Sequence, residues 1–152
     1  MTGGRVRTTR WLTNSAPIVV ALSFIGALVS IVARWPHQFG GHGNRNHMLS
    51  DFVSSGTALA PPFAFLVVFG VASLVVRRRD IWGTVACVVI LALSVLMVVG
   101  SMGEALAGST PDVPRAVQWF SGIWGTTAGV TLAALSFGSL RERRQSKIED
   151  TA

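Results

Sequence analysis

Three histidines and a carboxylate stand at regular spacing in one polar stretch of the chain. His37, His42 and His47 recur every five positions, and Asp51 follows four residues later. Imidazole and carboxylate groups suit zinc, copper or nickel, and a tight site needs three or four of them. The spacing matches neither one helical face nor a zinc finger. A divalent metal site is therefore one interpretation, and solvated histidines that respond weakly to acid are the other. No other cofactor is predicted.

Glu104 is the second candidate for chemistry. It follows a long apolar run at Gly103-Glu104 and is expected near a membrane interface. If the fold brings Glu104 and Asp51 into one cavity, two partly desolvated carboxylates would have separated pKa values and could act as acid and base. A lipophilic substrate, such as an isoprenoid or a quinone, could reach them from the bilayer. The alternative is a surface ion pair between Glu104 and Arg115 or Arg34.

The polar stretches that hold these candidate residues lie between four apolar runs. The clearest extends from Ile81 to Met102 without an ionisable side chain, and a helix needs roughly 20 such residues to cross a membrane. In lipid such a run is stable as a helix, because a helix satisfies its own backbone hydrogen bonds. The sequence predicts one all-α integral membrane domain over 1–152, with spans at about 16–33, 55–76, 81–102 and 117–140, outer loops at 34–54 and 103–116, a basic hairpin at 77–80 and a tail at 141–152.

The basic residues predict the orientation of this antiparallel four-helix bundle. Ten of the 13 Lys and Arg residues lie before the first span, in the hairpin or in the tail, and the other two loops hold Arg34, Arg45 and Arg115. The positive-inside rule then places both termini in the cytoplasm. Because the net charge of +6 comes from clusters beside apolar spans, the predicted partner is the lipid bilayer of the plasma membrane, and nucleic acid is not predicted. The excess of Arg over Lys favours a bacterial source.

Prolines and small residues predict how the helices pack. Pro61 and Pro62 fall inside the second span, where they should kink the helix near its outer end. The fourth span carries a small residue at every fourth position: Ser121, Gly125, Gly129 and Ala133. Small residues let membrane helices approach closely. The stripe could pack inside the bundle, or it could face outward and bind a second copy or another membrane protein.

The apolar centres of the spans hold no Asp, Glu, Lys, Arg or His, which argues against a pump, a coupled transporter or an ion channel. Cys87 is the only cysteine, which excludes an intramolecular disulfide. The favoured function is a non-enzymatic membrane protein that acts through helix–helix contacts, as an accessory subunit, an immunity-type factor or a regulator. The first alternative is an acid/base enzyme that uses Glu104 and Asp51. The second is metal or pH sensing by the histidine-rich loop.

Overall fold

The computed structural model describes residues 7–37, 44–106 and 112–149, which form five α-helices and no strand. In chain order these are α1 (Arg7–Ala33), α2 (Met48–Ser54), α3 (Phe63–Val75), α4 (Ile81–Leu106) and α5 (Arg115–Glu149). Three of the helices, α1, α4 and α5, contain stretches long and apolar enough to cross a membrane. The all-α class predicted from the sequence is confirmed, and the three apolar helices indicate membrane association.

The second predicted span differs from the structure. The sequence predicts a kinked helix over 55–76, whereas α3 begins only at Phe63, with Pro62 as its N-cap residue. Residues 55–62 are not helical, and we call them the non-helical segment. A proline disfavours helical geometry in the residue before it and lacks the N–H that a continuing helix needs. Pro61 and Pro62 therefore precede a helix instead of bending one.

The ends of the other helices follow from local chemistry. α1 ends at Ala33, where the sequence places the end of the first span, and Arg34 then adopts a positive φ of 54°. The Trp35 N–H donates to the Ser30 carbonyl at 2.8 Å, and the Arg34 N–H donates to the Ile31 carbonyl at 3.3 Å. This pair of bonds is the Schellman arrangement that satisfies carbonyls at a helix C-terminus.

The predicted loop at 103–116 and the predicted tail at 141–152 are partly helical. α4 continues past the predicted end of the third span to Leu106, and α5 begins at Arg115 and continues to Glu149. Since α5 has 35 residues, it is about 52 Å long. That is longer than a helix needs to cross the roughly 30 Å hydrocarbon layer of a membrane.

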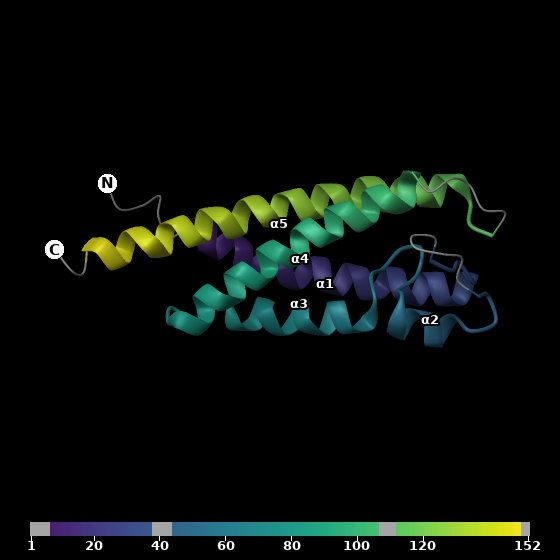
Figure 1. Cartoon of the computed structure of the whole chain (residues 1–152), viewed down its shortest axis with the longest axis horizontal. Coiled ribbons are helices and arrows are strands. Elements are labelled where there is room, and N and C mark those ends of the chain that lie inside the picture. Colours follow the sequence, from purple (N-terminus) through teal and green to yellow (C-terminus); the bar gives the residue numbers. More distant parts are fainter. Residues whose placement is uncertain (1–6, 38–43, 107–111, 150–152) are drawn as a thin grey trace.

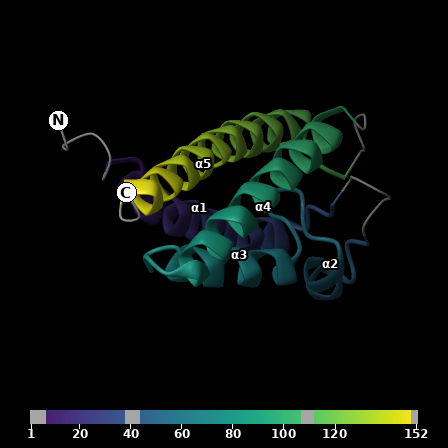
Figure 2. The same ribbon diagram turned by 60° about the vertical axis from the view of Figure 1, so that its left-hand side comes forward.

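The helices are arranged so that the two described ends of the chain lie together (Figure 1). The start of α1, the turn between α3 and α4, and the end of α5 share one end of the molecule, which we call the terminal end. The end of α1, α2, the end of α4 and the start of α5 lie at the opposite end, which we call the loop end. α4 and α5 form the most extensive helix pair, and they lie side by side in both views (Figure 2).

The apolar core occupies mainly the terminal half. Leu12, Phe69, Val76, Ile90 and Leu132, which come from α1, α5 and the α3–α4 hairpin, are all almost fully buried there. Each such side chain contributes roughly 1.5–3 kcal/mol when it is transferred out of water. In a membrane this term is smaller, and close packing between helices takes its place. The loop half is packed less completely.

Polar contacts join the helices at the terminal end. Arg143 of α5 donates from its two terminal nitrogens to the backbone carbonyls of Val76, at 2.6 Å, and Arg78, at 2.8 Å. Carbonyls at the end of a helix have no partner within that helix, so Arg143 caps α3 from a neighbouring element. Thr9 of α1 donates its hydroxyl to Glu142 of α5 at 2.8 Å. The last part of α5 therefore holds both α1 and the α3–α4 turn.

Candidate functional site: a cavity at the loop end

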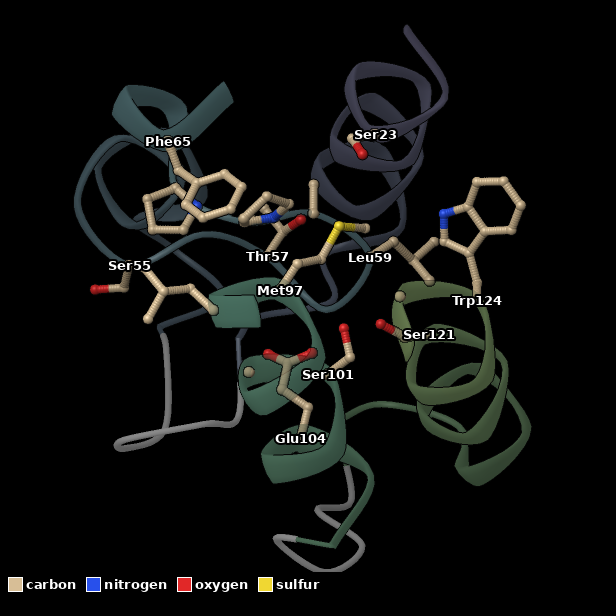
Figure 3. A pocket seen from close by; sticks show the side chains of 16 residues that line it. Ser23, Ser55, Thr57, Leu59, Phe65, Met97, Ser101, Glu104, Ser121 and Trp124 are labelled. Atoms are coloured by element: carbon tan, nitrogen blue, oxygen red, sulfur yellow. The ribbon is translucent and has the colours of Figure 1, made fainter. Parts of the chain in front are cut away.

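A cavity of about 210 Å³ lies in the loop half of the molecule, between α1, the non-helical segment, α3, α4 and α5 (Figure 3). Its lining residues are Ser23, Ser55, Thr57, Leu59, Ala60, Pro61, Pro62, Phe65, Leu96, Met97, Gly100, Ser101, Glu104, Ser121, Trp124 and Gly125. The cavity is therefore assembled from segments that are far apart in the sequence.

The non-helical segment is ordered by hydrogen bonds. The Thr57 N–H donates to the Ala60 carbonyl at 2.8 Å, which closes a tight turn, and the Ala58 N–H donates to the Trp35 carbonyl at 3.3 Å. Gly56 precedes this turn with a φ of 94°, a conformation that glycine adopts without steric cost. The segment is thus a defined wall of the cavity.

This segment lies directly against α1. A Cβ atom added to Gly26 would stand 2.9 Å from the Leu59 carbonyl oxygen, so only glycine permits the approach. Gly56, Thr57 and Ala58 are buried. Membrane proteins tolerate non-helical backbone where the protein buries it or where it lines a cavity, and this segment is partly buried and lines the cavity.

The cavity reaches well into the bundle. Ser23, Met97 and Trp124 lie nine or ten residues from the loop ends of α1, α4 and α5 respectively. At the rise of an α-helix this distance is about 15 Å. On all three helices the cavity therefore reaches the same distance from the loop end. That distance is about half the hydrocarbon thickness of a bilayer.

Hydroxyl groups and one carboxylate give the cavity its polarity. Among the lining residues that the structure describes, Glu104 is the only ionisable one, and its side chain is half-buried. Figure 3 shows the Glu104 carboxylate directed into the cavity, on the side of the Ser101 and Ser121 hydroxyls. Thr57 is 2% exposed, and in the described part of the chain its hydroxyl has no hydrogen-bond partner. The lining therefore combines one carboxylate and several hydroxyl groups with apolar side chains.

The two carboxylates predicted to act together differ in their relation to the cavity. Glu104 lines the cavity, whereas Asp51 is not among the lining residues. Asp51 lies on α2, where its carboxylate accepts the backbone N–H of Asn44 at 2.7 Å. The expected ion pair of Glu104 with Arg115 or Arg34 stays a prediction, and nearby Arg45 pairs with Asp112 at 3.0 Å.

The predicted metal ligands are only partly described. His37 is half-buried and His47 is exposed, and His42 lies outside the described residues. His47 borders a separate surface depression together with Arg34 and Arg45. Within the described ranges, no group of three or more His, Cys, Asp and Glu side chains is placed to hold a metal ion. The metal site stays a prediction.

The small-residue stripe of the fourth span lies partly against α4. A Cβ on Gly125 would meet the side chain of Ser101, and one on Gly129 would stand 2.8 Å from the Ser94 carbonyl oxygen. Ser121 lines the cavity and Ala133 is half-buried. The close approach that the stripe predicted is thus made to α4 of the same chain.

Several lining residues were missed by the sequence analysis. Ser101 could have been found, because it lies three residues before Glu104 and so shares its face of the helix. Ser23 is a hydroxyl residue in an apolar span, which is a weaker signal. Thr57 and Trp124 gave no usable signal, since only the tertiary fold brings them to the cavity.

Comparison of the chain with protein-family models, with curated proteins and with solved structures found no match. The function is therefore argued from the site itself.

Proposed function

We propose that this protein crosses the plasma membrane of a bacterial cell four times, with both termini in the cytoplasm. Ten of its 13 Lys and Arg residues belong to segments at the terminal end or to the polar residues beyond them, which favours that end as the cytoplasmic one. α3 has 13 residues, so its length is about 20 Å. The second crossing therefore requires the non-helical segment in addition to α3.

In this orientation the cavity lies in the outer half of the membrane, and we infer that its function is to bind a small amphiphilic molecule. The observation that carries this proposal is a carboxylate, several hydroxyl groups and aromatic rings around one cavity inside an apolar bundle. Polar groups inside a membrane are costly and usually functional. Binding sites of membrane proteins are often found where a crossing helix is interrupted, as it is here at the non-helical segment.

The other candidate functions have less support. An acid/base enzyme would have one carboxylate in the cavity instead of two, because Asp51 lies elsewhere. An accessory subunit that binds a partner through the small-residue stripe remains a proposal, but Gly125 and Gly129 already lie against α4. Affinity purification in mild detergent tests it, and recovery of a specific membrane partner would favour it over ligand binding.

Filling the cavity tests the binding proposal. A Cβ added to Gly100 meets no atom within 4 Å, and Gly100 lines the cavity, so Gly100→Leu should occupy the site without disturbing the helix packing. Val99→Leu is the matched control, because Val99 is 56% exposed on the outside of the same helix. The probe is benzyl alcohol, and its binding to purified protein is followed by saturation-transfer NMR.

We expect benzyl alcohol to bind the native protein and Val99→Leu, and we expect Gly100→Leu to lose this binding. Equal signals from all three proteins would show that the probe associates only with detergent or with the outer surface. That result, or the absence of any signal, would overturn the binding proposal.

A further inference from the structure

Exposed arginines from three segments of the chain lie at the terminal end of the molecule. Figures 1 and 2 show the start of α1, the α3–α4 turn and the end of α5 at this end. The exposed arginines of these segments are Arg10, Arg77, Arg78, Arg79, Arg141 and Arg144. We call these six residues the arginine surface. The fold thus gathers positive charges that are distant in the sequence.

Two contacts of α5 hold the three segments next to one another. Arg143 donates to the Arg78 carbonyl at 2.8 Å, which places the end of α5 against the turn. Glu142 accepts the Thr9 hydroxyl at 2.8 Å, which places the same end of α5 against the start of α1. The arginine surface is therefore one feature of the folded protein, and its three parts are not independent clusters.

The acidic side chains that the structure describes at this end are already bonded within the protein. Asp80 accepts the backbone N–H of Gly83 at 3.1 Å and lies 4.0 Å from Arg78. Glu142 is half-buried and accepts both the N–H and the hydroxyl of Thr9. Within the described ranges, Arg78 is the only member of the arginine surface that pairs with a carboxylate. The surface therefore keeps an excess of positive charge.

Two tryptophans place the arginine surface at the boundary of a membrane. Trp11 is 56% exposed and Trp82 is 61% exposed, and tryptophan rings favour the headgroup level of a bilayer. Trp11 directly follows Arg10, and Trp82 lies three residues after Arg79. Ala33, the last residue of α1, is 22 residues after Trp11. This separation is about 33 Å along a helix, close to the roughly 30 Å of the hydrocarbon layer. When α1 crosses the membrane, the arginines therefore lie at the depth of the lipid phosphates.

The chemistry of these side chains suits a phosphate group. All six are arginines, and a guanidinium group offers a planar fork of N–H donors that can bond two phosphate oxygens at once. The phosphate of phosphatidylcholine is accompanied by an ammonium group of the same headgroup, whereas the phosphate of phosphatidylglycerol is not. An excess of positive charge therefore favours the second kind of lipid. Each basic residue near an anionic membrane surface strengthens association roughly fivefold.

We propose that the arginine surface binds the headgroup of an anionic phospholipid of the phosphatidylglycerol class. This inference is independent of the proposed ligand of the cavity, which lies in the opposite half of the molecule. It is also independent of the orientation in the membrane, because protein in detergent can bind added lipid at either end. An acidic segment of a protein would match the charge as well, but the tryptophans beside the arginines favour a lipid.

Titration of lipid into the full-length protein tests the proposal. The protein is held in an uncharged detergent, and bound lipid is counted by native mass spectrometry. We expect phosphatidylglycerol to bind more tightly than phosphatidylcholine, and Arg77→Gln/Arg79→Gln to weaken phosphatidylglycerol binding about tenfold. Arg34→Gln/Arg115→Gln is the matched control, because it removes two exposed arginines from the loop end. The Kd of the control should equal that of the native protein.

A second pair of substitutions tests whether the three segments act together. Arg10→Gln/Arg141→Gln changes only α1 and α5, and we expect it to weaken phosphatidylglycerol binding by a similar factor. Unchanged binding in this pair would contradict a surface shared by the three segments. Equal losses in the terminal and loop-end pairs would show that binding follows net charge alone, which overturns the proposal. Equal binding of the two lipids to the native protein would also overturn it, and would favour an acidic protein segment as the partner.

A charge-conserving pair tests the role of the guanidinium group and guards against misfolding. Gel filtration and circular dichroism establish that each variant is folded. Arg77→Lys/Arg79→Lys keeps both charges and removes the forked donors, so we expect it to weaken phosphatidylglycerol binding severalfold and to retain a preference over phosphatidylcholine. If the glutamine pair at the turn does not fold, the lysine pair replaces it. An unchanged Kd in the lysine pair would contradict the forked contact with phosphate.

Discussion

Glu104 lies at the end of an apolar helix, where a charged group costs less free energy than it would at the centre of a membrane span. It lies two residues before the end of α4, and its half-buried side chain keeps part of its hydration. A carboxylate at the bilayer midplane would cost several kcal/mol more. The sequence predicted Glu104 as a site residue from its position at the end of an apolar run. It could not predict Thr57 or Trp124, because their part in the cavity depends on contacts between distant segments.

Two glycines on facing helices give opposite predictions for the same substitution. A Cβ on Gly129 would stand 2.7 Å from Val98 Cγ2 and 2.8 Å from the Ser94 carbonyl oxygen. Since that oxygen belongs to the backbone, α4 and α5 must separate, and we expect Gly129→Ala to destabilise the protein by about 1–3 kcal/mol. Gly100→Ala meets no atom within 4 Å and should leave stability unchanged or raised. Thermal unfolding in detergent compares them, and equal melting temperatures would contradict the assigned α4–α5 contact.

Among the helices and loops, the non-helical segment differs most from its prediction, because the sequence predicts a helix there. Residues 55–62 contain mainly small and apolar side chains, so hydropathy alone could not distinguish them from the first turns of a membrane helix. The two prolines gave the necessary signal, because each disfavours helix in the residue before it. The sequence did not show how this segment is held without helical hydrogen bonds. Its backbone donates a hydrogen bond to Trp35, and it packs closely against Gly26.

Arg143 allows a test of how the end of α5 holds the α3–α4 turn. Arg143→Met keeps most of the aliphatic length and removes the two bonds to the carbonyls of Val76 and Arg78. A bond that involves a charged group contributes about 1.5–3 kcal/mol, and we expect a loss near the lower end because Arg143 is only partly buried. Arg144→Met removes the same charge from an exposed neighbour and is the control. If both variants unfold at the same temperature, the capping role of Arg143 is wrong.

The two halves of the molecule differ in what they contain: one holds most of the apolar core and the other holds the cavity. The terminal half contains most of the buried apolar residues and the Arg143 and Glu142 contacts, so it fixes how the helices pack. The loop half contains the non-helical segment and the cavity. Because the cavity lies apart from the core, we expect a change in the cavity lining such as Gly100→Leu to leave the core intact.

The proposed topology, which is based on the distribution of Lys and Arg residues, can be measured in cells. Cys87 is the only cysteine, so a Cys87→Ser background needs one change before single cysteines are introduced at exposed positions. Asn46, Arg79 and Ser146 are exposed and lie on the loop between α1 and α2, on the α3–α4 turn and near the end of α5. With a membrane-impermeant maleimide, we expect Asn46→Cys to react in intact cells and Arg79→Cys and Ser146→Cys to react only after permeabilisation. Reaction of Arg79→Cys in intact cells would mean that α3 and the non-helical segment together do not cross the membrane. Reaction of Ser146→Cys in intact cells would mean that the orientation is opposite to the proposed one. The cavity would then lie in the inner half of the membrane.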